Sequence, residues 1–128
     1  MPSYGMTKAV DLPYEQAVAR VTDALKAEGF GILTTIDVQK TMKEKLGADL
    51  DQYVILGACN PQLAHRALQA EQDIGLLLPC NVIVYATDGQ TRVSVLDPQE
   101  ALGIAGNAAL APIARQAKEN LERALAAV

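Results

Sequence analysis

Apolar residues recur along the chain at two different spacings, which together predict a mixture of strands and helices. Residues 4–10 predict a first strand. Pro13 then suits the first turn of a helix, and Gly29 is a natural position for the end of that helix. Between them, apolar residues at the i, i+3, i+4 and i+7 positions indicate an amphipathic helix; these are Tyr14, Ala17, Val18, Val21 and Leu25.

An alternation with a period of two follows, and it predicts a second strand over residues 30–38. One face of this strand is expected to carry Ile32, Thr34, Ile36 and Val38. A short helix is expected over residues 41–46, closed by Gly47. Further strands are expected over residues 53–57, 81–87 and 92–96.

Three short motifs divide the second half of the chain. Asn60-Pro61 combines a helix cap with proline at the first helical position, and it predicts a helix through about residue 70. Asp88-Gly89 predicts a type I′ turn between two strands. Asp97-Pro98 ends the last strand and opens a helical turn, and a final amphipathic helix is expected over residues 108–127.

The resulting order of elements is β-α-β-(α)-β-(α)-β-β-α, within a single domain spanning residues 1–128. Successive strands follow one another without long crossovers, which favours an antiparallel arrangement. The predicted fold class is therefore α+β, with an antiparallel sheet of about five strands and two long helices on one of its faces.

Composition narrows the classes of function. The chain has four tyrosines, one phenylalanine and no tryptophan, so its core must be aliphatic. Its net charge of −4 and pI of about 4.9 argue against a nucleic-acid partner, which requires a basic surface. The longest apolar run, residues 74–78, is far too short to span a bilayer, so no membrane partner is expected. The expected location is cytoplasmic, where two cysteines are more often free thiols than a disulfide.

Two similar motifs, Cys59-Asn60-Pro61 and Pro79-Cys80-Asn81, lie where predicted strands end and begin. If these strands pair antiparallel, the motifs meet at one edge of the sheet. Gly31 lies at the start of the predicted strand 30–38, and Asp97 directly follows the strand 92–96. Antiparallel pairing therefore brings both residues to the same edge. This convergence predicts a ligand-binding site made of Gly31, Cys59, Asn60, Cys80, Asn81 and Asp97.

Three functions remain open for this edge. The first is binding of a small molecule. The second is thiol redox or sulfur chemistry, because Cys59 precedes a helix N-terminus, whose partial positive charge would lower the pKa of its thiol. The third is a structural or interaction module, because free cysteines are often buried and inert. Catalytic residues are left unassigned, and whether the protein is an enzyme stays undecided.

No metal or other cofactor is expected. Two cysteines supply too few ligands for a structural metal site. His65 is the one histidine, and a set made of Cys59, Cys80, His65 and Asp97 is conceivable. A lone histidine is more often a surface or packing residue, which is the interpretation favoured for His65.

The motifs, taken in order, resemble the bacterial and archaeal domain-of-unknown-function family 302. The segments that carry the resemblance are residues 29–38, 57–61, 74–82 and 97–98. The resemblance implies a fold similar to the TATA-box-binding-protein-like class, with a β-α-β4-α core, and it implies a homodimer. It implies no activity, and a fold shared with a DNA-binding protein is no evidence for DNA binding.

Overall fold

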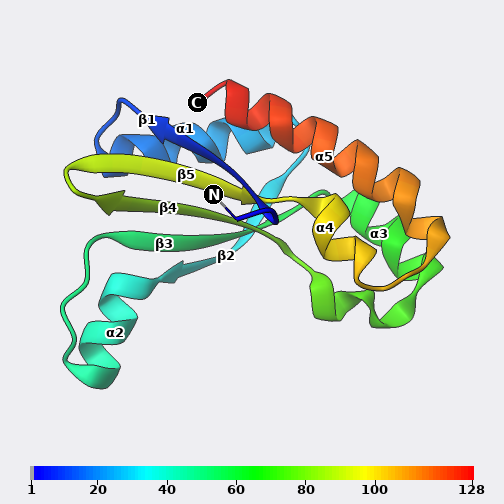
Figure 1. Ribbon diagram of the computed structural model, residues 1–128, viewed down its shortest axis with the longest axis horizontal. Helices are drawn as coiled ribbons and strands as arrows, with labels where there is room; N and C mark the ends of the chain where they lie inside the picture. Colours follow the sequence, from blue (N-terminus) through cyan, green and yellow to red (C-terminus); the bar gives the residue numbers. More distant parts are fainter. Residues whose placement is uncertain (1) are drawn as a thin grey trace.

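The fold of residues 2–128, described by a computed structural model, is built on one antiparallel sheet of five strands (Figure 1). The strands are β1 (Gly5–Val10), β2 (Gly31–Asp37), β3 (Tyr53–Cys59), β4 (Cys80–Thr87) and β5 (Gln90–Leu96). The helices are α1 (Tyr14–Ala27), α2 (Val38–Leu46), α3 (Pro61–Ala70), α4 (Pro98–Gly103) and α5 (Ala111–Ala126). Two 3₁₀ helices are η1 (Gln72–Leu77) and η2 (Ala108–Leu110). The predicted α+β class is confirmed.

The strands lie in the order β1-β5-β4-β3-β2, and every neighbouring pair is antiparallel. Figure 1 shows α1 and α5 above the sheet, while α2 extends below it at the connection between β2 and β3. The two long helices thus cover one face, as predicted. Within residues 2–128, no long helix covers the opposite face, and we call it the open face.

Local sequence explains where several elements begin and end. The Asn60 side chain accepts a hydrogen bond from the Leu63 amide at 3.2 Å and so caps α3, with Pro61 next to it. Asp88 and Gly89 both have positive φ angles, of 51° and 76°, which a type I′ turn requires. The predicted cap and hairpin turn are therefore both confirmed.

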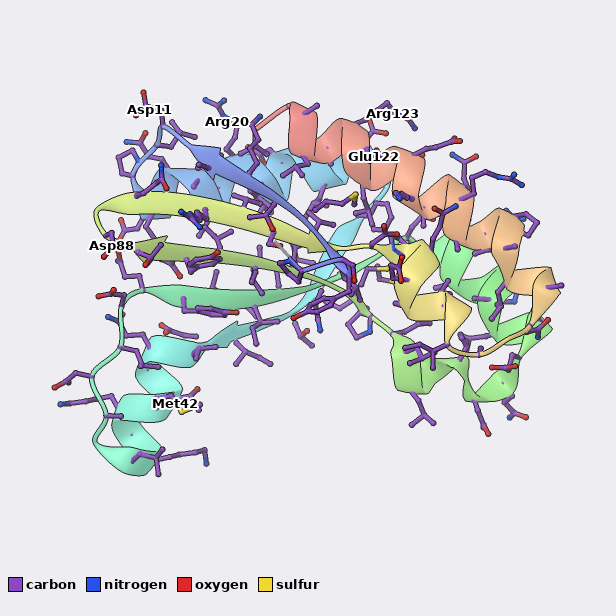
Figure 2. All side chains as sticks on the ribbon, viewed as in Figure 1. Asp11, Arg20, Met42, Asp88, Glu122 and Arg123 are labelled. Carbon is purple, nitrogen blue, oxygen red and sulfur yellow. The ribbon has the colours of Figure 1, made fainter. Side chains whose placement is uncertain are left out.

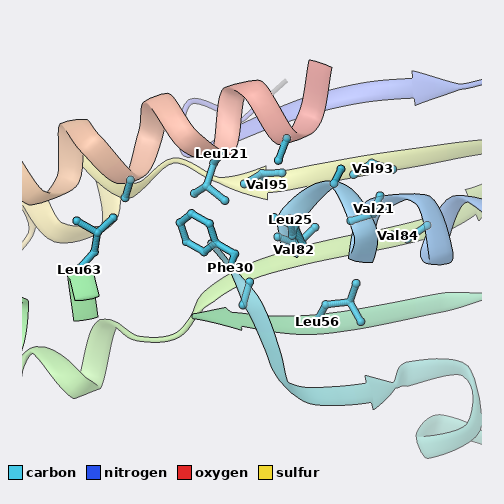
Figure 3. Close-up of a cluster of buried hydrophobic side chains, with 14 of the residues drawn as sticks. Val21, Leu25, Phe30, Leu56, Leu63, Val82, Val84, Val93, Val95 and Leu121 are labelled. Atoms are coloured by element: carbon cyan, nitrogen blue, oxygen red, sulfur yellow. The ribbon is translucent and has the colours of Figure 1, made fainter. Parts of the chain in front are cut away.

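The core lies between the sheet and the two long helices (Figure 3). Residues that alternate along β4 and β5 point into it, and three of them, Val82, Val84 and Val93, are fully buried. Figure 3 shows the Phe30 ring between Leu63 of α3 and Leu121 of α5. As composition required, aliphatic side chains provide nearly all of the buried surface.

The face assignment predicted for the second strand is wrong. A β-bulge between Ile32 and Thr34 inserts one extra residue into β2. Ile32 therefore pairs with the inward-facing Ala58, whereas Thr34 pairs with Gly57 on the open face. The bulge also turns Leu33 outward, which matters for the site described below.

Several element boundaries differ from the prediction as well, and one element was not predicted. The short helix begins at Val38, because the Asp37 side chain accepts a hydrogen bond from the Lys40 amide and caps it. The apolar run at residues 74–78 lies largely within the 3₁₀ helix η1, which the hydrophobic pattern did not indicate. Among the helices of residues 2–128, none has both the length and the apolar character needed to cross a bilayer.

Candidate functional site

The register of the sheet brings the two cysteine motifs to the same edge. Ala58 lies opposite Cys80 in the pairing of β3 with β4, and Gly31 lies opposite Cys59 in the pairing of β2 with β3. Asp97 follows β5 directly at the same end of the sheet. The predicted convergence of the four segments is therefore present.

A cavity of about 340 Å³ lies beside these motifs. Its walls come from the end of the sheet, the first turns of α3, the segment before β4 and the inward side of α5. Its lining residues are Phe30, Leu33, Thr34, Ala58, Cys59, Asn60, Leu63, Ala64, Ala67, Leu68, Leu78, Pro79, Cys80, Leu102, Ile113 and Ala117. Both cysteines and one of the two motif asparagines thus share one cavity.

Small side chains on two helices leave room for this cavity. Ala67 of α3 and Ala117 of α5 both line the cavity, and both are buried. Larger residues at these positions would fill the space between the two helices and the sheet end. The lining also includes Cys80 from the covered face and Thr34 from the open face. The cavity therefore wraps around the end of the sheet between β2 and β3.

Burial governs the chemistry of the two thiols. Cys59 and Cys80 are both free and partly buried. Burial raises the pKa of Cys80 to about 11, and the nearby Cys59 contributes to that rise. Burial also raises the pKa of Cys59. This direction is opposite to the lowered pKa expected for Cys59 from the adjacent helix N-terminus.

Asn60 connects the cavity wall to the end of α1. Its Oδ1 atom is committed to capping α3. Its Nδ2 atom lies close to Gly29, where an added Cβ would approach it to 3.0 Å. Gly29 has a positive φ angle of 83°, so glycine serves there both as a left-handed helix end and as a close neighbour of Asn60.

Asp97 is buried but lies outside the cavity lining. Its Oδ1 atom accepts a hydrogen bond from the Gln99 amide at 2.9 Å and caps α4. Its Oδ2 atom forms an ion pair with Lys118 of α5 at 2.9 Å. The hydrogen bond that the Lys118 ammonium donates to Asp97 raises the pKa of Lys118. Both carboxylate oxygens are engaged in holding α4 and α5 together.

Three other candidates stay outside the cavity. Gly31 and Asn81 are exposed at the sheet edge, and neither lines it. His65 is exposed on α3. Over residues 2–128, no three histidine, cysteine, aspartate or glutamate side chains are grouped so that they could hold a metal ion.

Most of the cavity wall comes from residues that the motifs did not indicate. Ala67, Ile113 and Ala117 were recognisable as apolar positions of helices, whereas Leu63 was not, and nothing in the spacing of these residues distinguished a cavity from a filled core. The exposure of Leu33 could not be predicted, because the residues of its strand alternate regularly in the sequence. A cavity depends on side-chain volumes across several elements, which local patterns do not encode.

A larger groove of about 760 Å³ lies at the opposite end of the sheet. It is lined by the β1–α1 turn and by the hairpin between β4 and β5, including Asp11, Tyr14 and Gln90. Its walls are shallow and contain no thiol, and over residues 2–128 no buried polar side chain there lacks a hydrogen-bond partner. The more apolar cavity beside the cysteines is the better candidate for a binding site.

Both the sequence and the fold are similar to those of known proteins. Residues 6–128 match the family model described as "Domain of unknown function DUF302". Among solved structures, the chain is similar to the crystal structure of the uncharacterized conserved protein DUF302 from Bacillus stearothermophilus, with 32% identity and a TM-score of 0.91. This similarity covers 98% of each chain. No curated protein matches the chain.

Proposed function

The chain belongs to the DUF302 family, and we propose that it binds a small molecule in the cavity beside Cys59 and Cys80. The single observation that supports this function is a partly open, apolar cavity of about 340 Å³ at the convergence of both cysteine motifs. Its size falls at the lower end of the range typical of small-molecule pockets.

The thiol chemistry favours binding over redox catalysis. A reactive cysteine needs a stabilised thiolate, and burial works against the thiolate at both Cys59 and Cys80. The thiols then act as small apolar parts of the wall, which is a common role for free cysteine.

A cavity-filling variant with a matched control tests this proposal. Ala117→Leu adds volume inside the cavity, whereas Ala124→Leu adds the same volume to a buried position two turns further along α5 and outside the cavity lining. A fragment library screened by saturation-transfer NMR should yield ligands that bind wild type and Ala124→Leu but not Ala117→Leu. Fragments that bind all three proteins equally would contradict the proposal.

We also propose that the open face and α2 form the interface of a homodimer. The observation that favours this second function is that α2 has no buried residue. A nine-residue helix is marginally stable alone in water, so it needs packing. Its apolar residues Val38, Met42 and Leu46 are spaced four apart and share one side, and Leu46 is 74% exposed. Figure 2 shows Met42 on the side of α2 turned toward the open space below the sheet.

The open face offers a complementary surface. Tyr53 and Tyr85 stack there with ring centroids 5.5 Å apart, next to Ile55 and Ile83. Ile36 of the neighbouring strand adds to this patch and is 47% exposed. A second copy would bring its own α2 to this face and receive the first copy's α2 in return, which is the geometry of a two-fold interface.

Charge supports a second copy as the occupant. The outward-facing residues of β3, β4 and β5 are Tyr53, Ile55, Gly57, Cys59, Asn81, Ile83, Tyr85, Thr87, Gln90, Arg92, Ser94 and Leu96. Arg92 alone among these described residues is charged, although the chain carries a net charge of −4. A nearly neutral face can meet its own copy without like-charge repulsion, and interface cores are depleted in charge.

Sedimentation velocity tests the dimer. Wild type should sediment at twice the 13.6 kDa mass of the chain. Ile55→Lys places a charge at the centre of the open face and should give a folded monomer, because a buried unpaired charge is costly. Gln69→Lys adds the same charge on the exposed side of α3 and should remain dimeric. A wild-type protein that stays monomeric at tens of micromolar would rule this interface out.

We propose a cytoplasmic location on the basis of the thiols. Cys59 and Cys80 are both free, and their side chains point to opposite faces of the sheet. Free thiols are typical of proteins in a reducing compartment. Fractionation of cells that express the protein, followed by alkylation of its thiols before lysis, tests both the location and the redox state.

A further inference from the structure

We infer that the ligand of this cavity is an uncharged, predominantly apolar molecule, long enough to extend from the cavity onto a leucine-lined rim at the surface. This inference rests on the proposed binding function and specifies the chemical class of its ligand. It follows from three properties of the cavity: the absence of charge in its walls, the absence of any buried side-chain nitrogen or oxygen without a hydrogen-bond partner among residues 2–128, and the exposure of two lining leucines.

The walls supply no charge. Every residue that lines the cavity is apolar or neutral, and Thr34 and Asn60 are its polar members besides the two cysteines. An ionised ligand group would lose its hydration on entry and meet no opposite charge. The protonated state favoured by burial keeps the cysteines neutral too. A charged ligand is therefore disfavoured throughout the cavity.

The walls also contain few polar groups that would need a hydrogen bond from a ligand. The Oδ1 atom of Asn60 already accepts the hydrogen bond that caps α3. Within residues 2–128, no buried side-chain nitrogen or oxygen atom lacks a hydrogen-bond partner. An apolar molecule that leaves the Asn60 Nδ2 atom and the Thr34 hydroxyl in contact with water can therefore enter without stranding a buried donor or acceptor, and its binding would come from the removal of apolar surface from water.

The cavity opens onto a rim of two leucines. Leu33, turned outward by the β2 bulge, is 68% exposed, and Leu68 of α3 is 45% exposed. Single exposed leucines are ordinary, but both of these belong to the lining of the same cavity. The apolar wall thus continues to the surface, and an elongated ligand could cover both leucines while its other end fills the interior.

A pair of dyes isolates the effect of charge. N-phenyl-1-naphthylamine is neutral, and 1-anilinonaphthalene-8-sulfonate has the same ring system with one added sulfonate. Fluorescence titration of the full chain should show at least tenfold tighter binding of the neutral dye. High salt screens the general repulsion of an anion by a chain with net charge −4, so the preference should persist in 0.5 M NaCl.

Variants then locate the dye. Ala117→Leu should abolish binding of the neutral dye, and Ala124→Leu should leave it unchanged. Leu33→Ser and Leu68→Ser should each weaken binding severalfold, whereas Leu76→Ser should not, because Leu76 is 88% exposed but lies outside the cavity lining. Equal loss in all three serine variants would indicate nonspecific surface binding and overturn the inference.

The outcomes distinguish a wrong ligand class from a wrong binding function. Equal or tighter binding of the sulfonated dye at a site blocked by Ala117→Leu would overturn the ligand class and leave the binding function standing. The same conclusion follows if neither dye binds but fragments do, and Ala117→Leu removes them. If neither dyes nor fragments respond to Ala117→Leu, both the ligand class and the binding function are wrong.

Discussion

The covered and open faces of the sheet carry similar aliphatic side chains in very different surroundings. On the covered face, Val82, Val84 and Val93 are fully buried beneath α1 and α5. On the open face, Ile55 and Ile83 are partly exposed, and Ile36 is nearly half exposed. Both rows arise because successive side chains of a strand point to opposite faces of the sheet.

This difference separates residues that fold the chain from residues available to a partner. Burial of apolar surface within the chain stabilises the covered face, so substitutions there must act on folding. The open face gains little from the fold of one chain, so its isoleucines and tyrosines are available for contact with another. The cavity combines both situations: it lies at the end of the sheet, and its lining includes buried residues such as Ala117 and exposed ones such as Leu33.

The largest expected effect comes from two neighbouring residues of β3. Leu56 points into the core and Ile55 points to the open face. Leu56→Ala should lower the free energy of unfolding by about 3 kcal/mol, because it removes buried surface and leaves a cavity. Ile55→Ala should lower it by less than about 1 kcal/mol when measured at protein concentrations low enough to dissociate a dimer.

Urea denaturation followed by circular dichroism measures both values. Raising the protein concentration sharpens the comparison, because a dimer contributes to stability by mass action. The cost of Ile55→Ala should then grow with concentration, while that of Leu56→Ala should change little. A cost for Ile55→Ala that matches Leu56→Ala at every concentration would remove the distinction between the two faces.

The two faces were only partly predictable from sequence. The turns and helix ends were predictable because single residues determine them, such as Asn60 at its cap and Gly89 in the hairpin. The bulge in β2 was not, because Ile32, Thr34 and Ile36 alternate as regularly as in an undisturbed strand. It arises from the pairing of β2 with β3, which is tertiary information.

The candidate site was predictable to a similar degree. Antiparallel pairing alone was enough to place Cys59 and Cys80 at one edge. The roles of their neighbours were not, because the cap and ion pair of Asp97 depend on where α4 and Lys118 lie. The cavity itself results from alanines on two helices far apart in sequence, and its volume becomes apparent only when they pack together.

The second prediction compares the two thiols across the faces. Cys80 lies on the covered side and its pKa is raised to about 11 by burial. The folded state therefore holds this proton more tightly than the unfolded state does, so stability falls as pH rises above about 9. Wild type should lose about 2 kcal/mol more between pH 8 and pH 11 than Cys80→Ala loses.

Denaturation of both proteins at each pH measures this difference, since lysines and tyrosines titrate alike in the two. Cys59→Ala serves as the control, because Cys59 follows Ala58 in β3 and lies on the side of the open face. It should change the pH dependence by a smaller amount. An identical pH dependence in wild type and Cys80→Ala would mean that Cys80 is as well hydrated as an exposed thiol.

The smallest expected effect tests how closely the open face is packed near the cysteine motifs. A Cβ atom added at Gly57 would overlap the Thr34 hydroxyl and lie 3.0 Å from Cγ of Pro79. Gly57→Ala should therefore cost between about 1 and 2 kcal/mol of unfolding free energy, as overpacking usually does. Gly31→Ala, at the same end of the sheet, has no atom within 4 Å of the added Cβ and should be close to neutral.

Combining Gly57→Ala with Thr34→Ala identifies the source of that cost. Removing the hydroxyl makes room for the new methyl group, so the double variant should recover at least about 0.5 kcal/mol relative to additivity. Additive costs would assign the crowding to Pro79 instead. Recovery would mean that the open face is closely packed at the cysteine end and free of cover only around its isoleucines and tyrosines. A second copy would then dock on that part of the face, leaving the cavity rim accessible to its ligand.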